Sequence, residues 1–213
     1  MKTGNGREAI LLAARDTFAR KGYDGASIRD IAQEADLSLS ALYYYFKSKQ
    51  DVLHEVVSHA YRSYISTMGT VLDACGDDAG LQLASAVRYL VNYRVTHTEV
   101  SRVVIRDADS LDADHFESVH QLQRDARQLM IDIVDRGNAA GVFATENSVL
   151  AARSILAMCN AIPLWYQSGG ALDAHDLEVS YVGYALRLVG FTQAEERGEY
   201  YFSLELPDAE DAD

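Results

Sequence analysis

Short polar side chains, aromatic rings and lysines lie close together in the segment SLSALYYYFKSK, which begins at Ser38. Four of them fall on one side of a short helical repeat: Ser38, Ser40, Ala41 and Tyr44. Hydroxyl groups can hydrogen-bond to base edges, and a methyl group or a flat ring can pack on the methyl group of thymine. Lys47 and Lys49 follow at the end of the repeat, where ammonium groups can meet phosphate oxygens. The segment therefore predicts a surface that reads double-stranded DNA.

Two short helices and a tight turn must position these side chains. Ser27 and Asp30 have the spacing of a capping box, which predicts that a first helix begins after Ser27. Asp36 stands where the chain must turn, and aspartate tolerates left-handed backbone angles better than most residues. Ser38 is the predicted N-cap of the second helix. The result is a helix-turn-helix, whose second helix enters the major groove of DNA.

Helices before and after this motif are expected to brace it. A first helix is predicted from about Arg7 to Arg20, with Gly22 at its C-terminal end. Ser48 and Asp51 repeat the capping-box pattern, which predicts a longer helix from about Lys49 toward Cys75. That helix would join the DNA-reading head to the rest of the chain.

The motif resembles that of the TetR family of transcriptional regulators. Residues 13–23 are similar to the family's first helix, and an ordered pattern covers the motif itself: Ser27, Ile31, Ala32, Ala35, Leu37, Ser38, Leu42, Tyr43, Phe46, Ser48, Lys49 and Leu53. Asp36 and Ser40 depart from the family pattern, because relatives usually have glycine there. We expect Asp36 to strain the turn, and Ser40 with Leu39 to shift the base preference.

The resemblance implies a homodimer that binds a palindromic DNA operator. Phosphate contacts are expected from Ser27, Tyr43 and Lys49, with Lys47 next. The full set of residues expected to contact DNA is Ser27, Arg29, Ser38, Ser40, Ala41, Tyr43, Tyr44, Lys47 and Lys49.

The pattern of apolar residues along the chain indicates an all-α protein of about nine helices, and its composition indicates a globular one. Of 213 residues, 48% are hydrophobic and only two are prolines, so long helices are permitted. No stretch of about 18 uncharged apolar residues is present, and the N-terminus lacks the pattern of a signal peptide. We therefore expect a cytoplasmic protein with no membrane partner.

The charge is distributed unevenly along the chain. The formal net charge is -13, but residues 1–54 hold eight lysines and arginines against seven acidic residues. The remaining residues hold 11 basic and 25 acidic side chains, a net charge of -14. An acidic body would repel DNA phosphates and so restrict DNA contact to the near-neutral N-terminal part. Affinity would then depend on a few contacts and on the avidity of a dimer.

Breaks in the apolar pattern divide the rest of the chain. Predicted helices follow breaks at residues 76–80 and 97–98, with later helices at about 114–139, 146–167 and 175–190. The predicted domains are a DNA-binding head (1–50), a ligand-binding and dimerisation domain (51–190) and an acidic, disordered tail (191–213). Tyr200, Tyr201 and Phe202 could pack locally.

The last two helices are expected to form the dimer interface, as the family resemblance implies. Small residues would permit close helix approach, and tyrosine and leucine side chains would supply apolar anchors. The predicted interface residues are Ala157, Ala161, Tyr181, Tyr184 and Leu188. The alternative is that these side chains belong to the core of one subunit.

The body resembles TetR-family regulators that respond to acyl-CoA thioesters of fatty-acid or steroid catabolism, through residues 103–111, 129–143 and 165–170. Apolar and aromatic walls with a few polar groups suit such a pocket. The predicted ligand-binding residues are Tyr89, Tyr93, Arg102, Val104, Arg106, Phe116, Leu122, Met130, Met158 and Trp165. The arginines could pair with CoA phosphates or, alternatively, with nearby acids such as Asp107 and Glu99. Leu164 stands where close relatives carry arginine, so an apolar effector without CoA remains open.

The sequence contains little that indicates a metal site or an enzyme active site. The close histidine pairs, His54 with His59 and His115 with His120, are five residues apart, unlike the four-residue spacing that places two ligands on one helical face. No phosphate-binding loop, zinc-protease motif or nucleophile elbow is present, so no cofactor or metal is expected. Cys75 and Cys159 are expected to be reduced, buried thiols, with a redox sensor as the alternative.

These observations lead to one main hypothesis and one alternative. The main hypothesis is a DNA-binding repressor that an apolar or acyl-CoA-type ligand releases from its operator. The alternative is a helical ligand- or partner-binding protein whose head no longer reads specific DNA, as the departures at Asp36 and Leu39 and the acidic body would allow.

Overall fold

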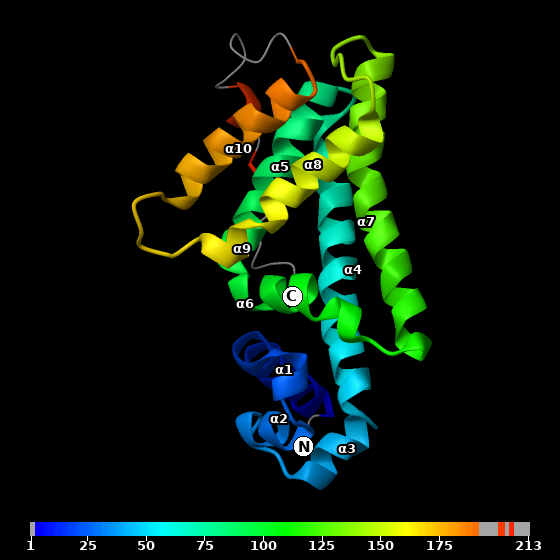
Figure 1. Cartoon of the computed structure of the whole chain (residues 1–213), viewed down its shortest axis with the longest axis vertical. Helices are drawn as coiled ribbons and strands as arrows, with labels where there is room; N and C mark the ends of the chain where they lie inside the picture. Colours follow the sequence, from blue (N-terminus) through cyan, green and yellow to red (C-terminus); the bar gives the residue numbers. More distant parts are fainter. Residues whose placement is uncertain (1–2, 192–199, 203–204, 207–213) are drawn as a thin grey trace. The chain divides into compact units, whose positions relative to one another are not determined.

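The computed structural model describes residues 3–191, 200–202 and 205–206, and within them the chain is helical without strands. The helices are α1 (Thr3–Gly25), α2 (Ile28–Glu34), α3 (Leu39–Tyr45), α4 (Lys49–Cys75), α5 (Ala79–Thr96), α6 (Thr98–Arg106), α7 (Ala113–Ala139), α8 (Ser148–Asn160), α9 (Ile162–Trp165) and α10 (Ala174–Leu188), with 3-10 turns η1 (Ala108–Ser110) and η2 (Tyr200–Phe202). Figure 1 labels α1 to α10. The predicted all-α class is confirmed, and the predicted nine helices are obtained when α8 and α9 are counted together.

The chain forms two compact units that do not follow the sequence order. Unit 1 combines Met1–Arg62 with Glu99–Gln123, and unit 2 combines Ser63–Thr98 with Arg124–Asp213. The predicted head ended at residue 50 and contained no later segment. The difference arises because α6, η1 and the start of α7 bury their apolar side chains among the first helices.

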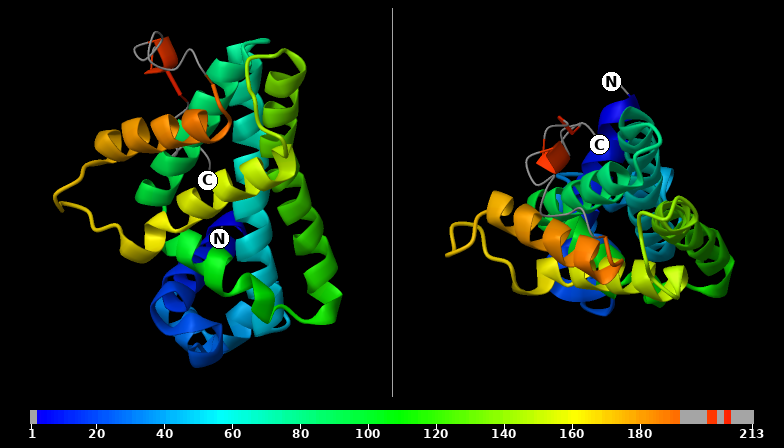
Figure 2. Two further views of the ribbon diagram at one scale, coloured as in Figure 1. Left: turned by 45° about the horizontal axis from the view of Figure 1, so that its top comes forward. Right: turned by 90° about the horizontal axis from the view of Figure 1, so that it is seen from above.

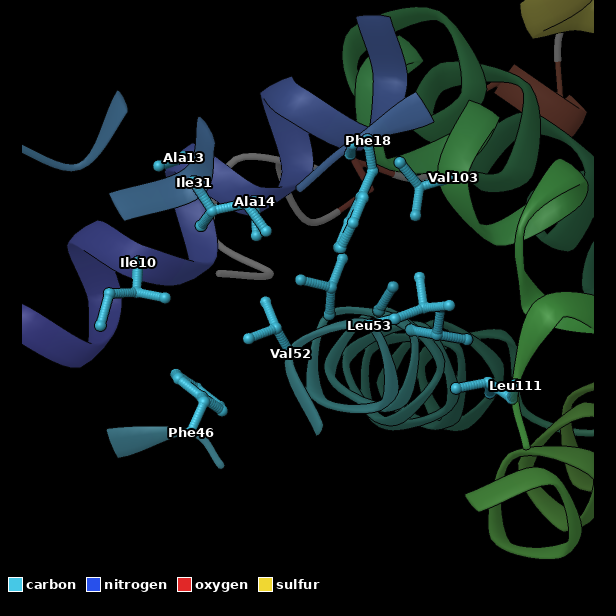
Figure 3. Close-up of a cluster of buried hydrophobic side chains, with 14 of the residues drawn as sticks. Ile10, Ala13, Ala14, Phe18, Ile31, Phe46, Val52, Leu53, Val103 and Leu111 are labelled. Carbon is cyan, nitrogen blue, oxygen red and sulfur yellow. The ribbon is translucent and has the colours of Figure 1, made fainter. Parts of the chain in front are cut away.

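One continuous apolar core holds unit 1 together. Phe18 of α1, Leu53 of α4 and Val103 of α6 are fully buried, and Leu111 is 7% exposed. Figure 3 shows the side chains of this core, with Phe18, Leu53 and Val103 contributed by three different helices. Burial of each such side chain contributes about 1.5–3 kcal/mol to folding. Segments far apart in the sequence are therefore joined by the same core that supports the helix-turn-helix.

The first helix of unit 1 ends at a glycine. Gly22 has a φ of 74°, which L-residues with a side chain rarely adopt, and it interrupts the helical geometry inside α1. The prediction that Gly22 closes the first helix is confirmed. The helix begins at Thr3 rather than at about Arg7.

Unit 2 is built around α5. α10 packs along α5, which also contacts α8 and α9, and both views in Figure 2 show α5 and α10 side by side. Asp173 caps α10 through a capping box with Asp176, so the helix begins at Ala174, close to the predicted start at about residue 175.

The single helix predicted for residues 146–167 is wrong. α8 ends at Asn160 and α9 begins at Ile162, with Pro163 in its first turn. Proline has no backbone N–H and its ring clashes with the preceding turn, so a helix cannot continue through it undisturbed. Ser148–Trp165 is nevertheless the one described stretch long and apolar enough to cross a membrane, with a mean hydropathy of 1.3 and 33% of it buried. It contains Arg153 and is divided between the two helices.

Part of the predicted disordered tail is ordered. Tyr200–Phe202 form a 3-10 turn against α5, and Tyr201 is 1% exposed. Arg88 of α5 donates a hydrogen bond to the Tyr201 carbonyl oxygen at 3.1 Å, and its guanidinium lies 4.9 Å from the centre of the Phe202 ring. Burial of the Tyr201 ring and the hydrogen bond to its carbonyl oxygen offset the conformational entropy that this segment loses when it becomes ordered. Most of the remaining tail lies outside the described residues.

Candidate nucleic-acid interface

The first helix of the motif, α2, begins at a capping box. The Ser27 hydroxyl accepts a hydrogen bond from the Asp30 backbone N–H at 3.1 Å, and an Asp30 carboxylate oxygen accepts one from the Ser27 backbone N–H at 2.9 Å. Lys21 pairs with the other Asp30 oxygen at 2.9 Å. The Lys21 ammonium and the Ser27 donors lower the pKa of Asp30 to about 2. The Asp30 carboxylate is therefore ionised, and the capping box intact, across the physiological pH range.

The turn of the motif passes through a left-handed residue. Asp36 has a φ of 53°, in the left-handed region that favours glycine. This is the strained backbone expected at this position. Ser38 then caps α3, because its hydroxyl accepts a hydrogen bond from the Ala41 N–H at 3.1 Å. A shallow hollow lies beside the turn and is lined by Arg29, Ala32, Gln33, Asp36, Leu37, Ser38 and Leu39.

The outer face of α3 is exposed. Leu42 is fully buried and anchors the helix to the core. Tyr44 is 78% exposed and Tyr43 47% exposed, which is unusual for large aromatic side chains without a partner surface. Ser38 and Ser40 are also exposed, and Ala41 is half-buried. The arrangement places flat rings, hydroxyls and a methyl group where base edges could be met.

Of the three basic residues in the predicted DNA-contacting set, Lys49 is placed differently from the other two. Arg29 and Lys47 have exposed side chains. The Lys49 ammonium instead donates hydrogen bonds to the carbonyl oxygens of Tyr23 (2.7 Å) and Ala26 (2.8 Å), and lies 4.0 Å from the centre of the Tyr23 ring. Its side chain holds the α1–α2 connection on the first turn of α4. The predicted phosphate contact of Lys49 stays a prediction, and its internal contacts were not foreseen.

The end of α6 is tied to α1 within unit 1. The Arg106 guanidinium donates to the carbonyl oxygens of Phe18 and Ala19 and makes a two-point ion pair with Asp107, with both N–O distances at 2.8 Å. The pKa of Arg106 is raised, chiefly by the Asp107 hydrogen bonds. The structure shows the pairing with Asp107 that was one of the two roles considered for this arginine, and the contact with CoA phosphates stays a prediction. These contacts fix α6 to the helix that precedes the motif.

The predicted ligand-binding residues are divided between the two units. Arg102, Val104, Arg106, Phe116 and Leu122 belong to unit 1, and Tyr89, Tyr93, Met130, Met158 and Trp165 belong to unit 2. In unit 2, Tyr89 and Tyr93 are buried with ring centroids 6.2 Å apart, and Met130 is 1% exposed. Trp165 is 47% exposed and Phe116 39% exposed, so neither is enclosed as a pocket wall would be. The ligand site stays a prediction.

The predicted dimer residues lie on or near the surface of unit 2. Ala157, Tyr184 and Leu188 are exposed, the last two at 52% and 40%, while Ala161 and Tyr181 are half-buried. Other large apolar side chains are exposed on the same or adjoining elements: Val149, Leu150, Leu164, Trp165, Leu172 and Val179. The alternative of an ordinary intramolecular core does not describe the exposed members of the set.

A histidine cluster near the motif escaped the sequence analysis. The rings of His54 in α4 and His115 in α7 lie 4.8 Å apart between centroids, and His115 contacts Asp51 and Asp112. The pairs that were considered share a helix, whereas this pair joins two helices separated by about 60 residues of chain. Among the described residues no group of three or more metal-binding side chains has the arrangement of a metal site.

Comparisons with known proteins agree with this architecture. The model of the TetR-family bacterial regulatory proteins matches residues 10–56, and that of the tetracyclin repressor-like C-terminal domain matches residues 76–189. The HTH-type transcriptional repressor KstR2 of Mycolicibacterium smegmatis is 29% identical over 196 residues, which cover 89% of this chain and 92% of the relative. These relatives are transcriptional regulators, not enzymes.

Solved structures give the same result. A TetR-family regulatory protein from Rhodococcus RHA1 superposes with a TM-score of 0.82 at 27% identity and covers 88% of this chain and 98% of that one. AibR, solved with isovaleryl coenzyme A and operator DNA, shares the fold with a TM-score of 0.77 at 17% identity over 84% of this chain and 96% of its own. The chain belongs to the TetR family of bacterial transcriptional regulators.

Proposed function

We propose that this chain is a repressor that binds a palindromic operator as a homodimer and leaves it when a small apolar or acyl-CoA-type effector binds. The exposed outer face of α3, capped by Ser38 and anchored by buried Leu42, is the observation that carries the proposal. A reading helix needs this combination, because the anchor fixes its orientation while the exposed face stays available to the major groove. The KstR2 relative is itself a repressor.

Selection of bound duplexes from a random pool tests the DNA-binding step. An enriched palindrome is expected, with half-sites about 34–36 Å apart, one helical turn. Tyr44→Ala should change the enriched bases, at a cost of about 1–3 kcal/mol for the preferred half-site. Tyr200→Ala truncates another exposed tyrosine, which lies in unit 2, and should leave the preference unchanged. Enrichment of no palindrome by the wild type would favour the alternative of a partner-binding protein.

The homodimer is supported by the exposed apolar side chains of α8 and α10. Large exposed apolar patches on a protein surface mark sites that a partner covers, and a second copy of this chain would cover this one in a dimer. Leu188→Glu should shift the sedimentation of the protein from dimer to monomer, since a desolvated carboxylate would face its symmetry mate. Leu12→Glu places the same charge at an exposed leucine of α1 and should leave the dimer intact. A dimer unaffected by Leu188→Glu would move the interface elsewhere.

The effector belongs to the proposal at the level of chemical class. Fold similarity to AibR, which was solved with isovaleryl coenzyme A, and the buried aromatic residues Tyr89 and Tyr93 support an apolar or acyl-CoA-type ligand. Leu164 in place of arginine leaves an apolar ligand without CoA open. Native mass spectrometry of protein purified from its own cells would identify a co-purifying ligand. Added back to the operator complex, that ligand should release the DNA. A ligand without any effect on release would refute this part.

A further inference from the structure

Two histidines lie against each other in unit 1, His54 in the second turn of α4 and His115 in the first turn of α7. His115 Nδ1 lies 2.7 Å from an Asp112 carboxylate oxygen, and its Nε2 lies 3.1 Å from an Asp51 carboxylate oxygen. A neutral imidazole carries one N–H, whereas the cation carries two. Only the protonated ring can donate to both carboxylates at once. The geometry around His115 is therefore that of a bound imidazolium.

The neighbouring His54 has the opposite environment. Its Nε2 lies 2.8 Å from the Ser118 hydroxyl and 3.3 Å from the Ser58 hydroxyl, which a neutral ring can satisfy. Burial lowers the pKa of His54, and the positive charge of His115 lowers it further. The two neutral rings are therefore arranged to take up one additional proton, on His115, and the resulting charge disfavours protonation of His54.

The charges around the cluster favour this distribution. The pKa of His115 is raised by its hydrogen bond to Asp112 and by the charges of Asp112 and Asp51. The positive end of the α7 helix dipole opposes the cation, but two carboxylates in direct contact outweigh it.

More distant groups complete the electrostatic environment. Glu55 and Arg62 of α4 act on His54 with opposite signs. The negative charge of Asp112 also acts on Tyr23, whose pKa burial raises together with Asp112 and Asp24. The net balance around His115 is acidic.

The same residues hold the end of the reading motif. The second oxygen of the Asp51 carboxylate accepts a hydrogen bond from the Lys47 backbone N–H at 2.9 Å. Gln50, next to it, donates to the Ser110 carbonyl oxygen (2.9 Å) and accepts from the Asp112 N–H (3.0 Å). The carboxylate that binds His115 thus also fixes the backbone that follows α3.

We propose that His115 is a proton-linked clamp between α4 and α7, which tightens on acidification and raises the affinity of the motif for DNA. Protonation adds one positive charge to the DNA-binding unit, beside Asp51, whose other oxygen binds the backbone of the exposed Lys47, and this added charge favours phosphate binding. The DNA part of this inference depends on the proposed function. The clamp itself depends on the contacts of unit 1 alone.

The sign of the stability effect follows from the two environments. A raised pKa in the folded state means that His115 stabilises the fold below a pH of about 6.5, and that this contribution is lost as the pH rises through the folded-state pKa. His54, with a lowered pKa, contributes above the same value and loses its contribution as the pH falls. His115→Gln should therefore lower the apparent Tm more at about pH 6 than at about pH 8, and His54→Gln should show the reverse.

His59→Gln is the matched control, because His59 is an exposed residue of the same helix. Its effect on the apparent Tm gives the baseline for replacing a histidine of α4 by glutamine at each pH. NMR of the histidine rings in the wild-type protein gives a second readout that needs no variant. One ring should titrate above the ordinary histidine pKa and a second below it. Equal Tm effects of His115→Gln at both pH values, or a His115 ring that titrates below the ordinary value, would overturn the clamp.

Fluorescence anisotropy with an enriched duplex at fixed ionic strength tests the link to DNA. Wild-type affinity should be about threefold or more higher at about pH 6 than at about pH 8, beyond any change seen with His115→Gln. The same pH dependence in both proteins would refute the link. If the wild type selects no duplex at either pH, the proposed function fails and the link fails with it. The Tm comparison still decides the clamp in that case.

Discussion

Replacement of Arg106 by methionine should destabilise the protein substantially. The Asp107 side chain is 5% exposed, and the Arg106 side chain 45% exposed. Removal of one partner from a fully buried ion pair costs about 3–5 kcal/mol, because the other charge stays buried. Solvent screening of the half-exposed arginine reduces this to about 2 kcal/mol. A loss of about 2 kcal/mol corresponds to a fall in Tm of roughly 4–8 °C for a chain of this size.

Arg15 and Asp16 provide the control. They are also adjacent and also 2.8 Å apart from Nε to Oδ1, but the Asp16 side chain is 38% exposed. Arg15→Met should therefore cost no more than about 1 kcal/mol. A double-mutant cycle of Arg106→Met with Asp107→Asn, followed by thermal unfolding, should give a coupling of at least about 1 kcal/mol. Equal Tm changes in Arg106→Met and Arg15→Met would refute the argument from the buried carboxylate.

Three further changes have defined outcomes. Lys49→Met should weaken binding to all duplexes and reduce the slope of log K against log salt by about 0.9 per subunit; an unchanged slope with a lower Tm would assign Lys49 to its contacts with Tyr23 and Ala26 alone. Asp36→Ala should lower the free energy of unfolding in urea by about 1 kcal/mol and Asp36→Gly should not, since glycine accepts positive φ; equal losses would contradict strain at the turn. Cys159 should escape a thiol reagent in the native protein at pH 8, because burial raises its pKa to about 12; mass spectrometry that maps modification to Cys159 before unfolding would contradict this.

Local signals in the sequence predicted local structure well. The caps at Ser27 and Ser38, the break at Gly22 and the limits of α4 were all foreseen, because each depends on side chains within three or four residues of one another. The break between α8 and α9 was missed, although Pro163 signalled it.

Long-range features could not be read in the same way. The assignment of α6 to unit 1 depends on Val103 joining the same core as Phe18, and the histidine cluster depends on contact between His115 and His54. No periodicity within one helix encodes either contact. Lys49 is an example at a single residue. Its position in the sequence is compatible with a phosphate contact, and nothing in the local pattern indicates the hydrogen bonds to Tyr23 and Ala26. These depend on the path of the α1–α2 connection, which the sequence pattern does not determine.

The discontinuous unit 1 determines how this protein can be recombined with its relatives. A chimera that exchanges residues 1–50 alone would place a foreign α1 against the native Val103 and Leu111, which belong to the same apolar core. Mismatched side chains there would leave voids or clashes that cost several kcal/mol. A DNA specificity transplanted from another regulator should therefore be carried by two segments exchanged together, residues 1–62 and 99–123. The portable module of this chain is defined by its core and not by a continuous stretch of sequence.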